Sequence, residues 1–170
     1  MRLDIKTADE LIDSGLEARW TERRHGPQAE VLRWVLRAFV ERGGPIPVHA
    51  VAAAFPDRLA GTVHDHVAAL DRNDLIVLAG DEIRFAYPFS ANPTAFVVTL
   101  ANGQERFACC ATDALALGAM LAARVFIRSR CHHCDDPLEL AADPTGPLDA
   151  GDVMVWVGRR GPGERACTGL

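Results

Sequence analysis

A thiol and a carboxyl group stand three residues apart in Cys110-Ala-Thr-Asp113, at the predicted start of an apolar helix. A thiolate binds soft metals and attacks carbon electrophiles. A carboxyl group one helical turn away faces the same space and can deliver or remove a proton there. These residue types at this spacing predict a site with one soft nucleophile and one proton carrier.

The position of Cys110 also predicts its ionisation. Unpaired backbone N–H groups at a helix start lower the pKa of a nearby thiol, so we expect Cys110 to be readily ionised. The alternative is structural: Asp113 complements the positive end of the helix dipole and Cys110 packs as a small apolar residue.

The chain has five cysteines, all within its last 62 residues. Their number is odd, and the first ten residues carry no apolar signal core. Both observations favour reduced thiols used for metal binding or catalysis over a disulfide framework. Cys109 should point away from Cys110 if the preceding strand continues, and we predict that it lies in the core.

A second cluster, Cys131-His132-His133-Cys134, has the spacing of one half of a zinc knuckle. A structural zinc site needs four ligands, and the sequence contains no second Cys-x-x-Cys pair. The cluster is therefore a candidate zinc turn, a mercury relay, a redox dithiol, or a turn without a ligand.

Composition excludes several classes of protein. The net charge is −5 and aromatic residues make up only 6%, which argues against a nucleic-acid binder. About half of the residues are apolar, enough for a buried core. No window is long and apolar enough to span a membrane, so a soluble cytoplasmic protein is expected.

The first half reads as a lead-in followed by a helical module. The lead-in covers residues 1–28, with a short helix over 7–19. Helical periodicity then predicts helices over 29–42, 47–55 and 58–72, and two strands flank a tight turn over 75–86. Residues 29–86 thus have the element order of a winged-helix module.

Such a module can bind DNA through its third helix. Here that helix combines three aspartates with two arginines, so its surface is not basic, as phosphate contact requires. We interpret the module as structural. The aspartates are Asp57, Asp65 and Asp71, and the arginines are Arg58 and Arg72.

The second half, residues 87–170, predicts a mostly antiparallel sheet with one central helix. Strands are expected over 94–100, 106–109, 124–129, 137–140 and 153–157, the helix over 112–122, and a Pro/Gly-rich loop over 143–151. The fold class is therefore α+β, with two domains, 29–86 and 87–170.

The longer motif Arg106-Phe-Ala-Cys-Cys-Ala-Thr-Asp-Ala-Leu115 follows the Asn102-Gly103 hairpin turn. Further on, Ser129-Arg-Cys131 opens a turn that precedes Pro137-Leu138. In these features the sequence resembles the organomercurial (alkylmercury) lyase family, over roughly residues 29–160. The helical first half also fits the architecture of that family.

The resemblance implies a reaction that cleaves carbon–mercury bonds without a cofactor. Cys110 is the first thiolate, Asp113 handles the proton, and a second thiolate shares the Hg(II) product. Cys167 is the candidate for this second thiolate. The alternative is that the chain stops before the true partner, a downstream cysteine or a selenocysteine that is encoded by an in-frame UGA codon misread as a stop.

Mercury ligands are then expected among Cys110, Cys167, Cys131 and Cys134, with zinc as a lesser option at Cys131 and Cys134. The implied partners are an organomercurial or another soft-metal small molecule, and cellular thiols. Two alternatives remain open: a protein of the same fold that sequesters soft metals, and a metal-responsive winged-helix regulator.

Overall fold

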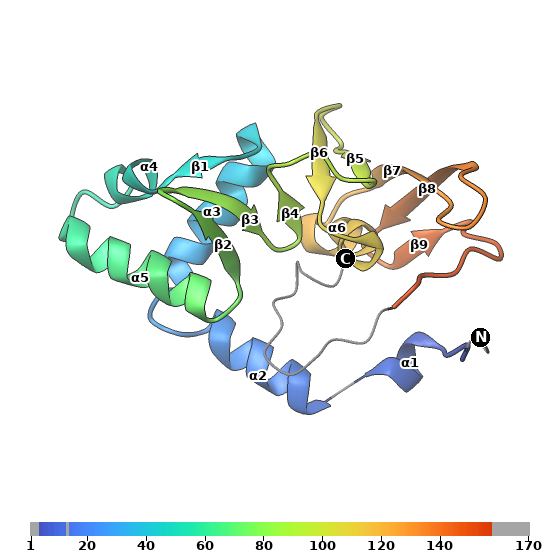
Figure 1. Ribbon diagram of the computed structural model, residues 1–170, viewed down its shortest axis with the longest axis horizontal. Helices are drawn as coiled ribbons and strands as arrows, with labels where there is room; N and C mark the ends of the chain where they lie inside the picture. The colour runs from blue at the N-terminus through green and yellow to red at the C-terminus, as the bar shows by residue number, and fades with distance from the viewer. Residues whose placement is uncertain (1–3, 13, 158–170) are drawn as a thin grey trace.

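A computed structural model of the chain describes residues 4–12 and 14–157. In this part of the chain, nine strands form one antiparallel sheet, and helices pack against it (Figure 1). The order of the strands is β1-β3-β4-β6-β5-β7-β8-β9, with β2 paired to β3. The predicted α+β class, with a mostly antiparallel sheet, is confirmed.

The lead-in contains two helices, α1 (Ala8–Leu11) and α2 (Ser14–Arg24), where the sequence predicted one. The start of α1 is closed by a reciprocal pair of hydrogen bonds. The Thr7 hydroxyl accepts from the Glu10 backbone N–H, and the Glu10 carboxylate accepts from the Thr7 backbone N–H at 2.8 Å.

The helical module has the three predicted helices and the predicted hairpin, and it adds a short first strand. Its elements are α3 (Ala29–Arg42), β1 (Ile46–Pro47), α4 (Val48–Ala53), α5 (Ala60–Arg72), β2 (Ile76–Ala79) and β3 (Glu82–Ala86). Pro47 is the N-cap residue of α4. The periodicity of α3 is confirmed, because its apolar stripe is buried while Arg33 and Arg37 lie outside the core.

The second half follows the predicted order, with one added short strand over 89–90 and two corrections. Its elements are β4 (Phe89–Ser90), β5 (Val97–Thr99), β6 (Glu105–Ala108), α6 (Ala111–Leu121), β7 (Val125–Arg130), β8 (Pro137–Asp143) and β9 (Gly146–Leu148).

The first correction is that the predicted Pro/Gly loop contains β9. The Asp143 carboxylate accepts hydrogen bonds from the backbone N–H (2.7 Å) and hydroxyl of Thr145, and Gly146 has a positive φ of 131°. This tight turn returns the chain to pair with β8. The second correction is that Val153–Val157 is not a strand, and its side chains are exposed.

The sheet runs without a break through both halves. Strands β3 and β4 pair in the registers Phe85↔Ser90 and Ala86↔Phe89, and β4 then pairs with β6 in the second half. The proposed division at residue 87 therefore falls in the turn between two paired strands.

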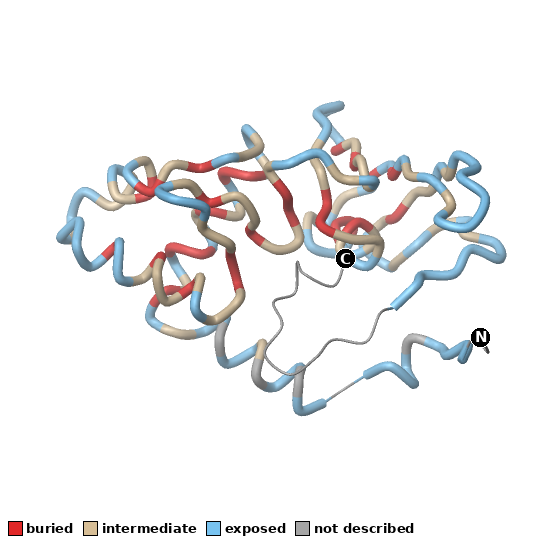
Figure 2. Tube along the Cα trace, viewed as in Figure 1, coloured by how far each residue is buried: buried red, intermediate tan, exposed pale blue. Residues whose placement is uncertain are grey.

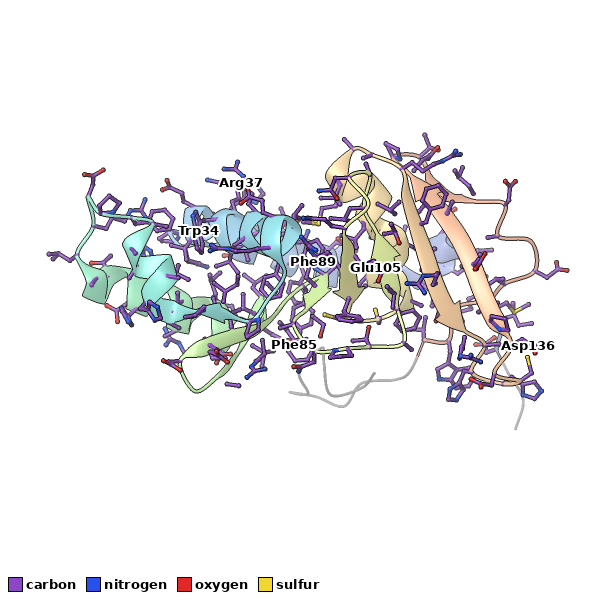
Figure 3. All side chains as sticks on the ribbon, turned by 90° about the horizontal axis from the view of Figure 1, so that it is seen from above. Trp34, Arg37, Phe85, Phe89, Glu105 and Asp136 are labelled. Atoms are coloured by element: carbon purple, nitrogen blue, oxygen red, sulfur yellow. The ribbon has the colours of Figure 1, made fainter. Side chains whose placement is uncertain are left out.

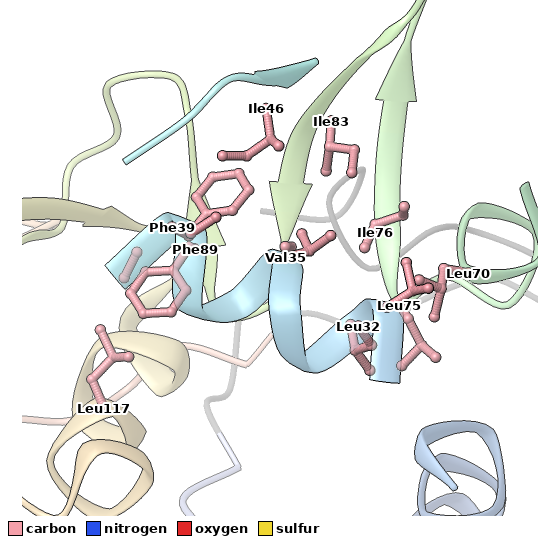
Figure 4. Close-up of a cluster of buried hydrophobic side chains, with 14 of the residues drawn as sticks. Leu32, Val35, Phe39, Ile46, Leu70, Leu75, Ile76, Ile83, Phe89 and Leu117 are labelled. Carbon is pink, nitrogen blue, oxygen red and sulfur yellow. The ribbon is translucent and has the colours of Figure 1, made fainter. Parts of the chain in front are cut away.

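One hydrophobic core also spans both halves. Buried side chains of α3, α5 and the β2–β3 hairpin continue through Phe89 to Leu117 on α6 (Figures 2 and 4). The rings of Phe39 and Phe89 stack with their centroids 6.1 Å apart and their planes at 14°. Both rings are fully buried, so the helical module and α6 are joined by apolar packing that excludes water.

Arg106 on β6 braces this junction. Its Nε donates to the carbonyl oxygens of Phe39 (2.7 Å) and Val40 (3.0 Å), and its Nη2 donates to Val40 at 2.6 Å. The Phe39 carbonyl also accepts from the Gly43 backbone N–H at 3.0 Å, so Arg106 adds a charged donor at this end of α3, where a cation complements the helix dipole. By contrast, the ion pair of Arg128 with Glu105 lies at the exposed surface.

Gly118 allows α6 to lie close to β8. A Cβ atom built on Gly118 would lie 2.6 Å from the backbone oxygen of Asp143, closer than real Cβ contacts allow. Gly61, within α5, has no atom within 4 Å of the same position. The glycine in α6 is therefore required by packing, whereas the one in α5 is not.

Candidate active site

The candidate active site lies where β6 ends and α6 begins. Cys110 is the N-cap residue of α6, with extended backbone angles (φ −149°, ψ 179°) that turn the chain from strand into helix. Cys109 is 5% exposed, and its backbone N–H donates to the Pro88 carbonyl. The prediction that Cys109 belongs to the core is confirmed, and Cys110 faces the other way, half-buried.

Cys110 and Asp113 meet, as their spacing predicts. The Cys110 thiol donates to the Asp113 carboxylate, with Sγ 3.2 Å from Oδ2. In return, the Asp113 backbone N–H donates to the sulfur at 3.4 Å. The sulfur therefore replaces the usual oxygen of an N-cap side chain, and it lies beside a carboxylate that can take its proton.

The expected ionisation of Cys110 is wrong. Burial raises the pKa of the Cys110 thiol above its usual value, and the negative charge of Asp113 raises it further. The backbone N–H groups of Asp113 and Thr112 lower the pKa, as expected of a helix start, but they do not offset the first two effects. The raised pKa and the hydrogen bond to Asp113 both favour the protonated form of the Cys110 thiol.

This arrangement suits a reaction in which a metal displaces the thiol proton. When a soft cation binds the sulfur, it stabilises the thiolate form, and Asp113 can accept the proton. The carboxylic acid so formed lies one hydrogen bond from the metal-bound sulfur. It can then protonate a group that leaves the metal.

Two hollows stand out among the described residues, and neither contains this pair. One, of about 290 Å³, lies between α3 and the end of α6 and is lined by Arg37, Val40 and Met120, among others. The other, of about 370 Å³, lies beside α5 and is lined in part by His64 and Asp81. The site formed by Cys110 and Asp113 is thus a half-buried surface position in this part of the chain.

Cys131 and Cys134 lie together in the turn between β7 and β8, where Cys134 is exposed. Backbone N–H groups of Cys134 and His133 lower the pKa of Cys131. For Cys134, the backbone N–H of Asp136 acts to lower the pKa, but side-chain hydrogen bonds with Asp136 and Cys131 outweigh it and raise the value.

The sequence analysis did not predict the contacts that Asp136 and Arg106 make. Asp136 follows Cys134 by two residues, and its carboxylate accepts from that thiol at 3.2 Å. A carboxylate so close to a cysteine pair was a visible signal. Arg106 stood within the quoted motif, but nothing local indicates that it reaches the end of a helix 66 residues away.

Metal ligation was also predicted, and two findings bear on it. Among residues 4–12 and 14–157, no group of three or more His, Cys, Asp or Glu side chains could hold a metal ion. The zinc option at Cys131 and Cys134 is therefore unsupported, since structural zinc takes four ligands. Cys167 lies outside the described residues.

The surface of α5 gives no support to DNA binding. Arg58, before the helix, pairs with Glu30 and lies over the Phe55 ring, 5.0 Å from its centroid. Asp71 accepts a hydrogen bond from the Leu78 backbone N–H at 2.9 Å.

In the described part of the chain, no helix has the length and apolar character needed to cross a membrane.

Comparisons with known proteins find a matching family model and similar solved structures. Residues 89–168 match the family model for alkylmercury lyase, MerB, and this segment includes Cys110, Asp113 and Cys167. Among solved structures, the chain is similar to the mercury-bound form of MerB2, with a TM-score of 0.67 and 24% sequence identity.

That similarity covers 80% of this chain and 66% of the MerB2 chain, so the two share a fold while this chain spans just under two thirds of the other. No curated protein matches.

Proposed function

Residues 89–168 match the family model for alkylmercury lyase, and on that premise we propose that this chain is a member of the family and cleaves the carbon–mercury bond of organomercurials by protonolysis. The products are a hydrocarbon and Hg(II) held by sulfur. The observation that carries the proposal is the hydrogen bond between the Cys110 thiol and the Asp113 carboxylate, 3.2 Å long, within the family segment.

In the first step, Cys110 captures the organomercury cation R–Hg⁺. The sulfur forms a bond to mercury, and its proton passes to the Asp113 carboxylate, which is already its hydrogen-bond acceptor. Mercury is soft and prefers sulfur to oxygen, so the ion stays on Cys110 while Asp113 keeps the proton. The raised pKa of the thiol makes this acceptor necessary near neutral pH.

In the second step, a further thiolate joins the metal, and we assign this role to Cys167. Its electron pair increases the electron density on the carbon bound to mercury. That carbon then takes the proton from Asp113, and the carbon–mercury bond breaks. In total, R–Hg⁺ and two thiols give R–H, one dithiolate-bound Hg²⁺ and one H⁺ released to solvent.

Cellular thiols complete the cycle in this proposal. They carry the organomercurial to the protein and remove Hg(II) by exchange on the protein's thiolates. We place the protein in the cytoplasm, where cysteines remain reduced. No metal or organic cofactor enters any step.

The test is release of benzene from phenylmercury by reduced full-length protein in excess thiol. Cys110→Ser and Asp113→Asn should each lower turnover by about 100-fold or more, the usual contribution of a positioned proton donor. Thr112→Ala, in the same helical turn with an exposed side chain, is the matched control. Unchanged turnover in both site variants would overturn the assignment.

Sequestration of soft metals is the second candidate, because the half-buried Cys131 and the exposed Cys134 offer a thiol pair in addition to Cys110. The same assay separates the two functions. Mercury bound at stoichiometric amounts without benzene release would select sequestration.

A further inference from the structure

The turn that joins β7 to β8 contains a thiol pair that the proposed reaction does not use. It lies at the end of the hairpin, and Asp136 marks its place, far from Trp34 on α3 (Figure 3). Two backbone hydrogen bonds close the turn: the Cys131 N–H donates to the Asp136 carbonyl at 2.8 Å, and the Asp135 N–H donates to the Cys131 carbonyl at 2.9 Å.

Side-chain contacts hold the same turn in place. Arg130 donates from Nη1 to the Asp135 carbonyl at 2.8 Å and pairs with the Asp135 carboxylate at 3.2 Å. Asp135 adopts a left-handed conformation with φ 60°, which reverses the chain after Cys134. The turn is therefore a defined loop whose shape does not depend on a bound ion.

The two thiols of this turn influence each other. The Cys134 side chain helps to lower the pKa of Cys131, after the backbone N–H groups of Cys134 and His133, and the Cys131 side chain helps to raise the pKa of Cys134. Cys134 is exposed and Cys131 half-buried. The Cys134 thiol also lies 3.2 Å from the Asp136 carboxylate, so an acceptor for its proton is present. The same contact, at the same distance, joins Cys110 to Asp113.

We propose that Cys131 and Cys134 form a second, solvent-accessible mercury site that chelates Hg(II) with two sulfur ligands, separate from the site at Cys110. The binding step is Hg²⁺ plus two Cys–SH giving a dithiolate-bound Hg²⁺ and two H⁺. Asp136 takes the proton of Cys134 first and then releases it to solvent. No oxidant or reductant is consumed.

The number of ligands selects the metal. Among the described residues no third His, Cys, Asp or Glu completes a metal-binding group with this pair. Zinc needs four ligands in a structural site, whereas Hg(II) is satisfied by two thiolates in a nearly linear arrangement. A linear S–Hg–S unit holds its two sulfurs well apart, and the exposed Cys134 side chain can rotate outward to provide that distance.

That Hg(II) is the ion which this pair meets in the cell rests on the proposed function. The ability of the two thiols to bind Hg(II) does not. The exposed position suits capture of Hg(II) from small thiols or from the Cys110 site. Once one sulfur has bound the ion, the other acts within the same turn at high effective concentration. A pair of this kind should therefore retain Hg(II) against a monothiol much better than one cysteine does.

The experiment uses inorganic HgCl₂ and full-length protein with Cys110→Ser and Cys167→Ser, which leaves the hairpin pair and the buried Cys109. A second protein adds Cys131→Ser and Cys134→Ser. Native mass spectrometry counts bound mercury, and competition with glutathione measures retention. We expect one Hg(II) per chain in the first protein, and retention about 100-fold weaker or more in the second.

Each single variant, Cys131→Ser or Cys134→Ser, should lose most of the retention, because the chelate needs both sulfurs. Equal retention with and without the pair would overturn the proposal. So would full retention in either single variant, or tighter binding of Zn(II) than of Hg(II) by the pair. If the starting variant does not fold, the number of bound Hg(II) ions is measured in the native chain. Removal of the pair should then lower that number by one.

This test is independent of carbon–mercury cleavage, because the starting protein already lacks Cys110. Failure of the proposed function appears only in benzene release by the native chain. Failure of the second site appears only in mercury retention by the hairpin pair.

Discussion

Replacing Asp113 by asparagine should change two properties of Cys110 in opposite directions. Asparagine has nearly the same shape but no charge, so it removes the negative field that raises the pKa of the thiol and leaves the burial unchanged. The sulfur should then ionise more easily. At the same time, the site loses the group that carries the proton to carbon.

The size of the first effect follows from the distance between the two groups. A unit charge 3.2 Å from the sulfur costs the thiolate about 1 kcal/mol even with the screening of bulk water. That energy corresponds to roughly a fivefold change in the thiolate population. Because Cys110 is half-buried and less screened, this value is a lower limit.

The assay compares alkylation by iodoacetamide with benzene release at neutral pH. Peptide mass spectrometry follows Cys110, with the exposed Cys134 as an internal reference. In Asp113→Asn, alkylation of Cys110 should become about fivefold faster or more, while benzene release falls about 100-fold. Thr112→Ala should change neither rate.

The opposite result would refute this reasoning. If alkylation of Cys110 slowed in Asp113→Asn, the carboxylate would act mainly as a base that activates the resting thiol. If alkylation did not change, the two side chains would not be in contact in solution.

Three further predictions concern stability and pH. Gly118→Ala should lower the free energy of unfolding by about 1–3 kcal/mol through overpacking, whereas Gly61→Ala should raise it by about 0.5–1 kcal/mol; urea denaturation measures both. Arg106→Ala should cost about 2 kcal/mol because helix-end carbonyls lose a charged donor, and the exposed Arg128→Ala should cost less than about 1 kcal/mol.

The third of these predictions follows from the raised pKa of Cys110. Alkylation should titrate with a midpoint above the ordinary thiol value of about 8.5. Because the folded state holds this proton more tightly than the unfolded state, the stability that it contributes is complete at neutral pH and decreases as pH rises through that range. Urea denaturation of the native chain and Cys110→Ala at neutral and alkaline pH measures the difference, and a midpoint below that of a free thiol would contradict the prediction.

Periodicity and turn chemistry predicted most of the elements. The apolar stripe of α3 and the Gly80-Asp81 turn between β2 and β3 are local patterns, and both elements form as expected. Strand β9 was missed because it is three residues long and rich in Gly and Pro, and its conformation is set by pairing with β8. Residues 153–157 have strand-like composition, but among the described residues they pair with no strand.

The sequence by itself determined which chemical groups are present and how they are spaced. A helix that starts at Cys110 must place Asp113 one turn away, so their meeting follows from local geometry. The pair of Cys131 and Cys134 is local in the same sense, since four residues of one turn contain both thiols.

Only the tertiary structure decided the protonation of Cys110, the brace formed by Arg106 and the stacking of Phe39 on Phe89. Each depends on segments far apart in the chain, which exclude water from a thiol, bring a cation to the end of a helix, or join two rings. Local patterns arise from hydrogen bonds and sterics between near neighbours. Burial and electrostatics instead depend on everything that surrounds a group, and that is known only when the chain is folded.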